Sequence, residues 1–576
     1  MGVLVLALLP VAPSLGASWI AEDASILGYV DRHGPFSDWA SSQYGLELVR
    51  FWRPLVTTSW WFGERAFGME PSGLRLLNVA GHLLATLLAA RIARAAGASV
   101  RAGFLAAALI ASFPEVGGTV TWLAGRTDVL CAALMLAAVW SVLRGWALVG
   151  ALASFAACAT KEFAFVLPLW AAAFLWARGA DRRAFVRGFL AVLCAALAAF
   201  VWRRLALGGF QGGYLLATRD LGAMLPEVPR AIGSLAVALG AFLPALLVLG
   251  GLGWAAGSLS PRLFLAGLVA GAAALVPLLP LVRHAPLEEQ NLRLLFVAET
   301  GFAFAAAGAF AREPRRGIAL ALALAVGFVL VGWRSGRGLA DVLEWREAGA
   351  IADRVVARTL DAVRSARSAD HPVLAAGFPR AWRGAYCLGW GAADRFRAPF
   401  EVAPRPVWPL RAMFPATPER PLAVAARADG TAWPFDDSPV VALLALRDEA
   451  GGEPVRLELD ERSFQSVPDR SPRLAFGPFE GALRIEVVAY TELGYASALL
   501  GGPGSGETSL MRILSAADTS RVATIGDALL QARDVGATRA FLELRAVGAE
   551  GALLAASPWI EVAWDPALRN PARPGS

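Results

Sequence analysis

The chain has 576 residues, of which 56% are hydrophobic and 17% are charged, below the roughly 25% charged residues of a soluble domain. The net charge of +6 is unevenly divided, because residues 341–576 hold 26 Arg and 30 acidic residues and the remainder holds 27 bases and 17 acids. The basic surplus therefore belongs to the part of the chain with long apolar runs. This pattern favours basic membrane loops over a nucleic-acid-binding surface and excludes an ordinary soluble protein.

Apolar runs up to residue 333 predict membrane-spanning helices, because a bilayer core of about 30 Å needs about 20 apolar helical residues. The run at the N-terminus is an alternative candidate for a signal peptide, since small residues follow it, but no basic segment precedes it. We expect eleven spans, at 3–20, 76–93, 102–113, 129–143, 146–160, 163–177, 185–202, 231–253, 263–282, 294–310 and 317–333.

The charges on the short loops predict the orientation. If the N-terminus is cytoplasmic and the spans alternate, the inner loops carry many Arg residues and only two acids, Asp181 and Glu313, as the positive-inside rule requires. Eleven spans then place the C-terminal region outside the cytoplasm, and a count of ten would place it inside. We expect a multi-pass protein of the cell (inner) membrane with a cytoplasmic N-terminus. The inner Arg residues are Arg91, Arg94, Arg101, Arg144, Arg178, Arg182, Arg183, Arg187, Arg262, Arg312, Arg315 and Arg316.

The C-terminal region begins with helical periodicity from Asp341 to Arg367, followed by a buried strand at 372–379. Strand-like runs follow at 440–446, 455–459, 483–489, 541–547 and 559–564, with a helix expected at 524–532. We therefore expect a transmembrane domain at 1–338, a small extracytoplasmic α/β unit at 339–420 and a β-rich, sandwich-like unit at 421–576. Only Cys387 lies in this region, so it holds no internal disulfide.

Charged motifs occur where predicted spans meet the expected outer face. Glu22 and Asp23 follow the first span, and adjacent carboxylates can accept a proton from a hydroxyl or bind a divalent cation, although two acids at a helix end are more often simply hydrated. Trp122-Leu-Ala-Gly-Arg-Thr-Asp128 places Arg126 and Asp128 at the fourth span. The planar fork of Arg matches phosphate oxygens, and a local Arg–Asp pair that caps the helix is the alternative.

Lys161, followed by Glu162, is the only lysine in a chain with 53 basic residues. This suggests a task that needs a compact ammonium group, with chance retention as the alternative. Glu288-Glu-Gln-Asn-Leu-Arg293 precedes the tenth span, and Asn78 and His82 share one face of the second. No nucleotide-binding or hydrolase motif occurs in a supporting context.

The order and spacing of these motifs resemble the membrane-embedded glycosyltransferases of the GT-C fold. The similarity is greatest to protein O-mannosyltransferase-like families, including the membrane half of the tetratricopeptide-containing O-mannosyltransferases. It covers residues 3–333 and also includes Arg53-Pro54-Leu55, Pro114 with Glu115, and Arg293-x-x-Phe296. The sequence departs from the family pattern in five places. Glu22 stands where Asp is commoner, Arg75 and Phe113 replace His, and Gly118 replaces Glu. The Glu-Arg-Tyr core of the family is altered to Gln-Asn-Leu-Arg293.

The resemblance implies transfer of a sugar from a polyprenyl-phosphate donor to an extracytoplasmic hydroxyl on a protein, glycan or lipid. Asp23 or Glu22 would deprotonate the acceptor, and Lys161, Arg126 and Arg293 would contact the donor phosphate. No cofactor is required by this expectation, although the acidic pair could hold a divalent cation. The expected partners are the donor, membrane lipid and the acceptor, without nucleic acid. The candidate donor-phosphate or substrate-binding residues are Arg53, Asn78, His82, Glu115, Arg126, Asp128, Lys161, Glu162, Glu289 and Arg293.

Two other functions fit the same composition. A non-catalytic membrane scaffold would present the β-rich region outside the cell. A lipid or sugar transporter would also be polytopic with charged groups in its spans, but such proteins commonly carry internal repeats, and no such symmetry is evident in the sequence.

Overall fold

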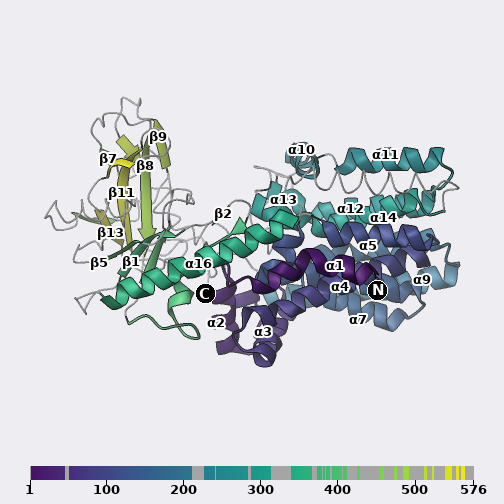
Figure 1. Cartoon of the computed structure of the whole chain (residues 1–576), viewed down its shortest axis with the longest axis horizontal. Coiled ribbons are helices and arrows are strands. Elements are labelled where there is room, and N and C mark those ends of the chain that lie inside the picture. The colour runs from purple at the N-terminus through teal and green to yellow at the C-terminus, as the bar shows by residue number, and fades with distance from the viewer. Residues whose placement is uncertain are drawn as a thin grey trace.

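A computed structural model shows a long helical bundle, from which helix α16 (Leu339–Ser365) leads to a group of strands (Figure 1). Up to residue 365 it describes 2–45, 51–113, 115–209, 226–240, 242–282, 287, 289–312 and 339–365. Beyond residue 365 it describes 373–378, 381–382, 385–388, 392–404, 407–411 and the later strands given below.

Five described helical segments are long and apolar enough to cross a membrane, so the chain is an α-helical membrane protein. They are Pro71–Ala95 (α4), Leu123–Leu143 (η5 and α6), Arg182–Leu207 (α9), Pro261–Val282 (α12, η9 and α13) and Asn291–Ala309 (the end of η10 and α14). Within these segments, α6 is Arg126–Leu143, α12 is Pro261–Leu275 and α14 is Phe296–Ala309. Each contains or nearly contains one predicted span. A sixth results if α10 (Val228–Leu239) and α11 (Phe242–Ala255), which meet at 71°, form one bent span.

The remaining apolar helices are shorter than the roughly 20 residues that cross a bilayer core. Helix α1 covers only Gly2–Val11, about 15 Å, before a 3₁₀ turn, so it is too short to cross a bilayer alone. Helices α5 (Val100–Ser112), α7 (Ala147–Cys158) and α8 (Leu167–Arg178) have 13, 12 and 12 residues. The predicted span at 317–333 lies outside the described residues. The count of eleven, and with it the sidedness of the termini, stays a prediction.

Small residues allow the closest helix packing in the bundle. A Cβ atom at Gly267 of α12 would lie 2.1 Å from the backbone nitrogen of Ala305 in α14, and one at Gly301 would lie 2.4 Å from that of Gly271. Between apolar helices in a membrane, such close backbone contact supplies the packing energy that water exclusion supplies in soluble proteins. Helices α12 and α14 are therefore held as a tightly fitted pair.

Short elements gather at one end of the bundle, where α16 also arrives (Figure 1). The helices there include α2 (Asp23–His33) and α3 (Pro54–Phe67). Helix α16 spans Leu339–Ser365 and confirms the predicted helical periodicity, since Val342, Trp345 and Ile351 are all buried. The short helical turns are η1 (Ala12–Gly16), η2 (Ser37–Trp39), η3 (Gln43–Gly45), η4 (Gly117–Thr121, a π-helix), η5 (Leu123–Gly125), η6 (Glu162–Val166), η9 (Val276–Leu278), η10 (Glu289–Leu295) and η11 (Ala392–Phe396), and α13 is Leu279–Val282.

The strands occur only after α16 in the described chain. β1 (Val373–Phe378) lies between β4 (Val407–Arg411, parallel) and β5 (Val424–Arg427, antiparallel), and β2 (Ala381–Trp382) pairs with β3 (Ala385–Tyr386). A larger sheet has the order β6-β13-β11-β8-β9, with β12 against β11, and β7 pairs with β10. The bounds are β6 Val455–Leu459, β7 Arg473–Ala475, β8 Arg484–Thr491, β9 Arg512–Ser515, β10 Val522–Thr524, β11 Arg539–Val547, β12 Leu553–Ala556 and β13 Ile560–Trp564.

Most of the strand predictions agree with these bounds. β6 coincides with the predicted run, and β1, β8, β11 and β13 overlap theirs. The predicted strand at 440–446 lies outside the described residues. Thr524, expected to begin a helix, ends β10 instead, and the rest of that predicted helix is also outside the described chain. The sandwich arrangement and the proposed domain boundaries stay predictions.

Candidate functional site

The centre of the candidate site is a carboxylate held between two cations. Asp128, in the first turn of α6, is fully buried, and its Oδ1 accepts a hydrogen bond from Lys161 Nζ. Its Oδ2 accepts a hydrogen bond of 2.7 Å from Nη1 of Arg293, which comes from η10. Lys161 is only 1% exposed and immediately precedes η6. Three charged residues far apart in the sequence thus meet at one point.

A second ion pair continues from this point along the chain. Glu162 follows Lys161, and its Oε2 accepts hydrogen bonds from Nη2 and Nε of Arg53 at 2.7 and 3.2 Å. Burial by itself would raise the pKa of Glu162, but the Arg53 charge and its hydrogen bonds lower that pKa below its ordinary value. The consecutive Lys and Glu therefore each have a partner of opposite charge at the same end of the bundle.

The two predicted catalytic carboxylates have different surroundings. Asp23 begins α2 and is fully buried, with Oδ2 accepting from the backbone N–H of Ile20 and Oδ1 from that of Ala124, both at 3.0 Å. Burial raises its pKa to about 7. Because both oxygens are occupied, Asp23 connects the start of α2 to the loop before α6.

Glu22 has an oxygen available for chemistry. Its side chain is partly buried, and its Oε2 is a buried atom with no hydrogen-bond partner among the described residues. Burial raises the pKa of Glu22 to about 8, and the Asp23 charge raises it further, against the lowering effects of a backbone hydrogen bond and of Arg293. Arg293 thus lies within electrostatic reach of Glu22 while it pairs with Asp128.

The side chains of Asn78 and Arg126 donate hydrogen bonds to backbone carbonyl oxygens of neighbouring segments. The Asn78 amide donates to the carbonyl oxygens of Val120, Trp122 and Leu123 at 3.1–3.3 Å and accepts from Arg126 Nε at 3.0 Å. The other nitrogens of Arg126 donate to the carbonyls of Ser59 and Leu74. The Arg126 guanidinium also lies 4.5 Å from the centre of the Trp60 ring and is fully buried. This arrangement makes Arg126 a positioning residue for the loop before α6, in place of the phosphate contact that we expected.

Arg75, which the resemblance to the GT-C families marks only as a departure, also donates hydrogen bonds that hold backbone segments together. Its guanidinium is fully buried and donates to the carbonyl oxygens of Ala17, Ser18 and Thr121 at 2.6–2.9 Å. It therefore joins the segment before Glu22 to the π-helix η4. The signal that could have revealed it is the cost of an arginine beside an apolar span, which demands internal partners.

Close backbone contact explains the glycine in the Trp122–Asp128 motif. A Cβ atom at Gly125 would lie 2.2 Å from the carbonyl oxygen of Gly118 and 2.9 Å from that of Thr119. Gly118, in turn, faces Arg293 and Trp345, whose side chains would lie 3.2 Å from an added Cβ. The loop before α6 thus folds back on the π-helix only because these positions lack side chains.

The other predicted residues lie away from the Asp128 contacts or are not described. His82 is buried in α4 with its ring centre 6.4 Å from that of Phe296, and Glu115 is buried just before η4. Glu289 begins η10, but its side chain lies outside the described residues. Within the described part of the chain, no three His, Cys, Asp or Glu side chains gather to hold a metal ion.

The C-terminal region covers the candidate site, which the sequence did not indicate. The Trp122 ring stacks on Trp345 of α16 at 5.5 Å and contacts Tyr386 of β3 at 5.2 Å, while the Arg293 guanidinium lies 4.5 Å from the Trp122 ring. Tyr386 Oη donates to Asn291 Oδ1 at 3.0 Å. Trp122 thus separates the buried charges from α16.

Comparison with known proteins adds no assignment: no protein-family model matches the chain, and no curated protein is significantly similar to it.

Proposed function

We propose that this chain is an integral membrane glycosyltransferase that moves a sugar from a polyprenyl-phosphate donor to a hydroxyl acceptor outside the cytoplasm. The observation that carries the proposal is the convergence of Lys161 and Arg293 on Asp128 beside Glu22. A buried cation, Lys161, and a partly buried one, Arg293, share one carboxylate and can take a phosphate group as a further counter-ion. A carboxyl group with an available oxygen next to them can accept the acceptor's proton.

The proposed reaction is a single displacement. The acceptor oxygen attacks the anomeric carbon, the bond from that carbon to the phosphate oxygen breaks, and its electron pair stays on the phosphate. Lys161 and Arg293 stabilise the charge that develops there, as fixed cations do in a water-poor site. The hydroxyl proton passes to Glu22 in its ionised form, whose share grows as the pH rises towards the raised pKa of about 8, since both oxygens of Asp23 are held by backbone amides. The inversion that this step implies is an expectation from the family resemblance.

The test uses the full-length protein in nanodiscs with radiolabelled polyprenyl-phosphate sugars and a panel of hydroxyl acceptors, including water. We expect Glu22→Gln to lower turnover by about 10²–10⁴-fold with donor affinity kept, which is the usual contribution of a general base. Lys161→Met is expected to weaken donor binding. Glu70→Gln, at an exposed acid of the same region, is the matched control and should leave both unchanged.

Two outcomes would contradict the proposal. The first is absence of both donor binding and transfer with every polyprenyl-phosphate sugar. The second is turnover that Glu22→Gln, Asp23→Asn and Lys161→Met all leave at the wild-type level.

A second function, the non-catalytic scaffold, is favoured by one observation. Trp345 and Tyr386 close over Trp122, and Ala21 next to Glu22 donates its N–H to the Cys387 carbonyl at 2.7 Å. These contacts suit a C-terminal region that is permanently fixed on the membrane domain as well as one that opens and closes over the site. If neither the wild type nor Trp345→Ala, which removes part of the cover, binds donor or transfers sugar while the fold is retained, the scaffold is preferred.

A further inference from the structure

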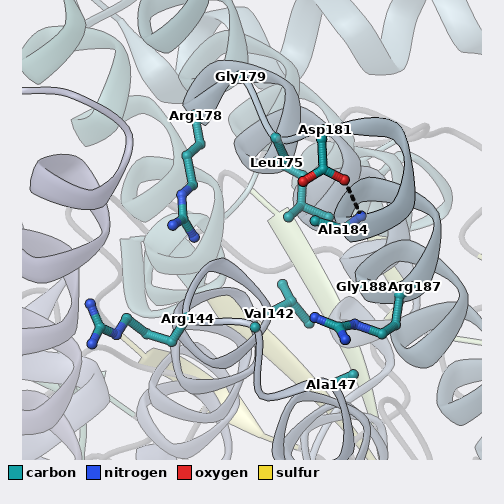
Figure 2. Close-up of a pocket in the computed structure, with 12 residues that line it drawn as sticks. Val142, Arg144, Ala147, Leu175, Arg178, Gly179, Asp181, Ala184, Arg187 and Gly188 are labelled. Carbon is teal, nitrogen blue, oxygen red and sulfur yellow. Dashed lines mark hydrogen bonds between the residues drawn. The ribbon is translucent and has the colours of Figure 1, made fainter.

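A cavity of about 300 Å³ lies among the ends of four helices of the bundle (Figure 2). It is lined by the end of α6, the start of α7, the end of α8 and the start of α9. Asp128 and Val142, which lines the cavity, are 14 residues apart on α6, so about 21 Å along the helix axis separates the two sites. That distance is about two thirds of the thickness of a bilayer core, so the cavity lies towards the membrane interface opposite the charged cluster.

The cavity is strongly basic. Arg144, Arg178 and Arg187 line it, and none of them forms an ion pair with a described residue. The one acid in the lining, Asp181, uses its Oδ1 to accept from the backbone N–H of Ala184 at 2.8 Å and so caps the start of α9. Figure 2 shows the Arg178 side chain extending from the end of α8 into the open space, and the Arg187 side chain running back towards Val142. The described charges around the space therefore favour an anion.

Two glycines shape the rim of the cavity. Gly145 and Gly179 adopt φ values of +81° and +73°, which residues with side chains rarely adopt, and each forms the tight turn between two helices. A Cβ atom at Gly145 would lie 3.6 Å from Nη2 of Arg187, and one at Gly179 would lie 3.4 Å from Nη1 of Arg262. The turns thus leave room for guanidinium groups beside them.

Exposed apolar side chains surround this basic cavity. Trp146 and Leu148, at the start of α7, are 52% and 73% exposed, and Val186 on α9 is 44% exposed. The Arg144 guanidinium lies 5.6 and 5.9 Å from the ring centres of Trp140 and Trp146. Tryptophan and arginine side chains together are typical of the headgroup level of a membrane, with the apolar side chains directed to lipid.

We propose that this cavity binds the phosphate-bearing headgroup of an anionic phospholipid. Guanidinium groups match phosphate oxygens in shape and charge, and the exposed apolar surface beside them suits the acyl chains that a free phosphate ion lacks. The volume is at the lower end of the range for small-molecule sites, enough for a headgroup. The expected cytoplasmic location of these loops agrees with the leaflet that carries most anionic lipid. This inference does not depend on glycosyl transfer.

The test is native mass spectrometry of the full-length protein, titrated separately with an anionic phospholipid, a zwitterionic phospholipid of the same chains, and inorganic phosphate. We expect the anionic lipid to bind most tightly. The double substitution Arg178→Gln/Arg187→Gln should weaken it by roughly 10- to 100-fold, because two charge-assisted contacts are lost. Arg91→Gln/Arg101→Gln, which removes two exposed Arg residues near the turn between α4 and α5, outside the cavity lining, is the matched control and should retain wild-type affinity.

Three results would overturn the proposal. Equal weakening by both double variants would show a general charge effect without a specific site. Equal affinity for the two phospholipids would show that the phosphate charge is not recognised. Binding of inorganic phosphate as tight as that of the lipid would assign the cavity to a free anion. Thermal melting of each variant verifies that the bundle is intact.

Discussion

Because Lys161 and Arg293 share the carboxylate of Asp128, we expect Lys161→Met to destabilise the wild-type protein but to stabilise the Asp128→Asn variant. In the wild-type protein, Lys161→Met removes one cation and leaves Asp128 paired with Arg293 at 2.7 Å. Loss of one hydrogen bond to a charged group costs about 1.5–3 kcal/mol. Asp128→Asn is more damaging, because it leaves the buried Lys161 and the partly buried Arg293 beside each other without the carboxylate, and breaking the buried Lys161–Asp128 pair in this way costs about 3–5 kcal/mol.

Once Asp128 is Asn, Lys161 is a buried charge without a counter-ion among its described contacts. Replacing it with Met, which has a similar volume, should then stabilise the protein. The expected order of thermal stability is wild type, Lys161→Met, the double variant, and Asp128→Asn last. Unfolding in mild detergent, followed by tryptophan fluorescence and compared at one pH, measures this order.

The exposed pair between Arg230 and Glu227 serves as the control. Its atoms are also 2.7 Å apart, but the side chains are 68% and 30% exposed, so Glu227→Gln should cost less than about 1 kcal/mol. If Lys161→Met lowers stability equally in the wild-type and Asp128→Asn backgrounds, the two residues are not coupled, and the charged cluster described here is wrong.

Three further predictions address other parts of the molecule. The pKa of Glu22 is raised to about 8 from an ordinary value of 4.5, so the stability that this shift contributes is complete below about pH 4.5 and is lost as the pH rises through 8. Glu22→Gln should therefore melt at a higher temperature than wild type at pH 9 and at a similar temperature at pH 4.5. Equal dependence of the melting temperature on pH in the two proteins would refute the raised pKa. Gly125→Ala should destabilise the protein by more than 2 kcal/mol through overpacking, whereas Gly233→Ala, whose Cβ meets nothing within 4 Å, should be neutral or slightly stabilising in the same melting assay. Trp345→Ala should loosen the contact between the C-terminal region and Trp122 and so raise the rate at which a thiol reagent labels the buried Cys387, measured by peptide mass spectrometry. An unchanged labelling rate would mean that Trp345 does not hold this contact closed.

The sequence by itself determined the membrane character of the chain and the kind of element at most positions. Apolar runs long enough for a bilayer predicted α4, α6, α9, α12 and α14, since length and composition decide whether a helix can span. Periodicity likewise predicted α16 and the buried face that carries Trp345. The unusual single lysine pointed to Lys161 before any contact was known.

The tertiary structure alone decided what each charged side chain does. Arg126 and Lys161 are both basic residues near a helix end. The Arg126 guanidinium donates its hydrogen bonds to Asn78 and to backbone carbonyls, whereas the Lys161 ammonium pairs with Asp128. Glu22 and Asp23 are adjacent, but backbone amides occupy both oxygens of only one. A sequence records the charge of a side chain, whereas its role depends on which donors and acceptors the packing of distant helices brings within 3 Å.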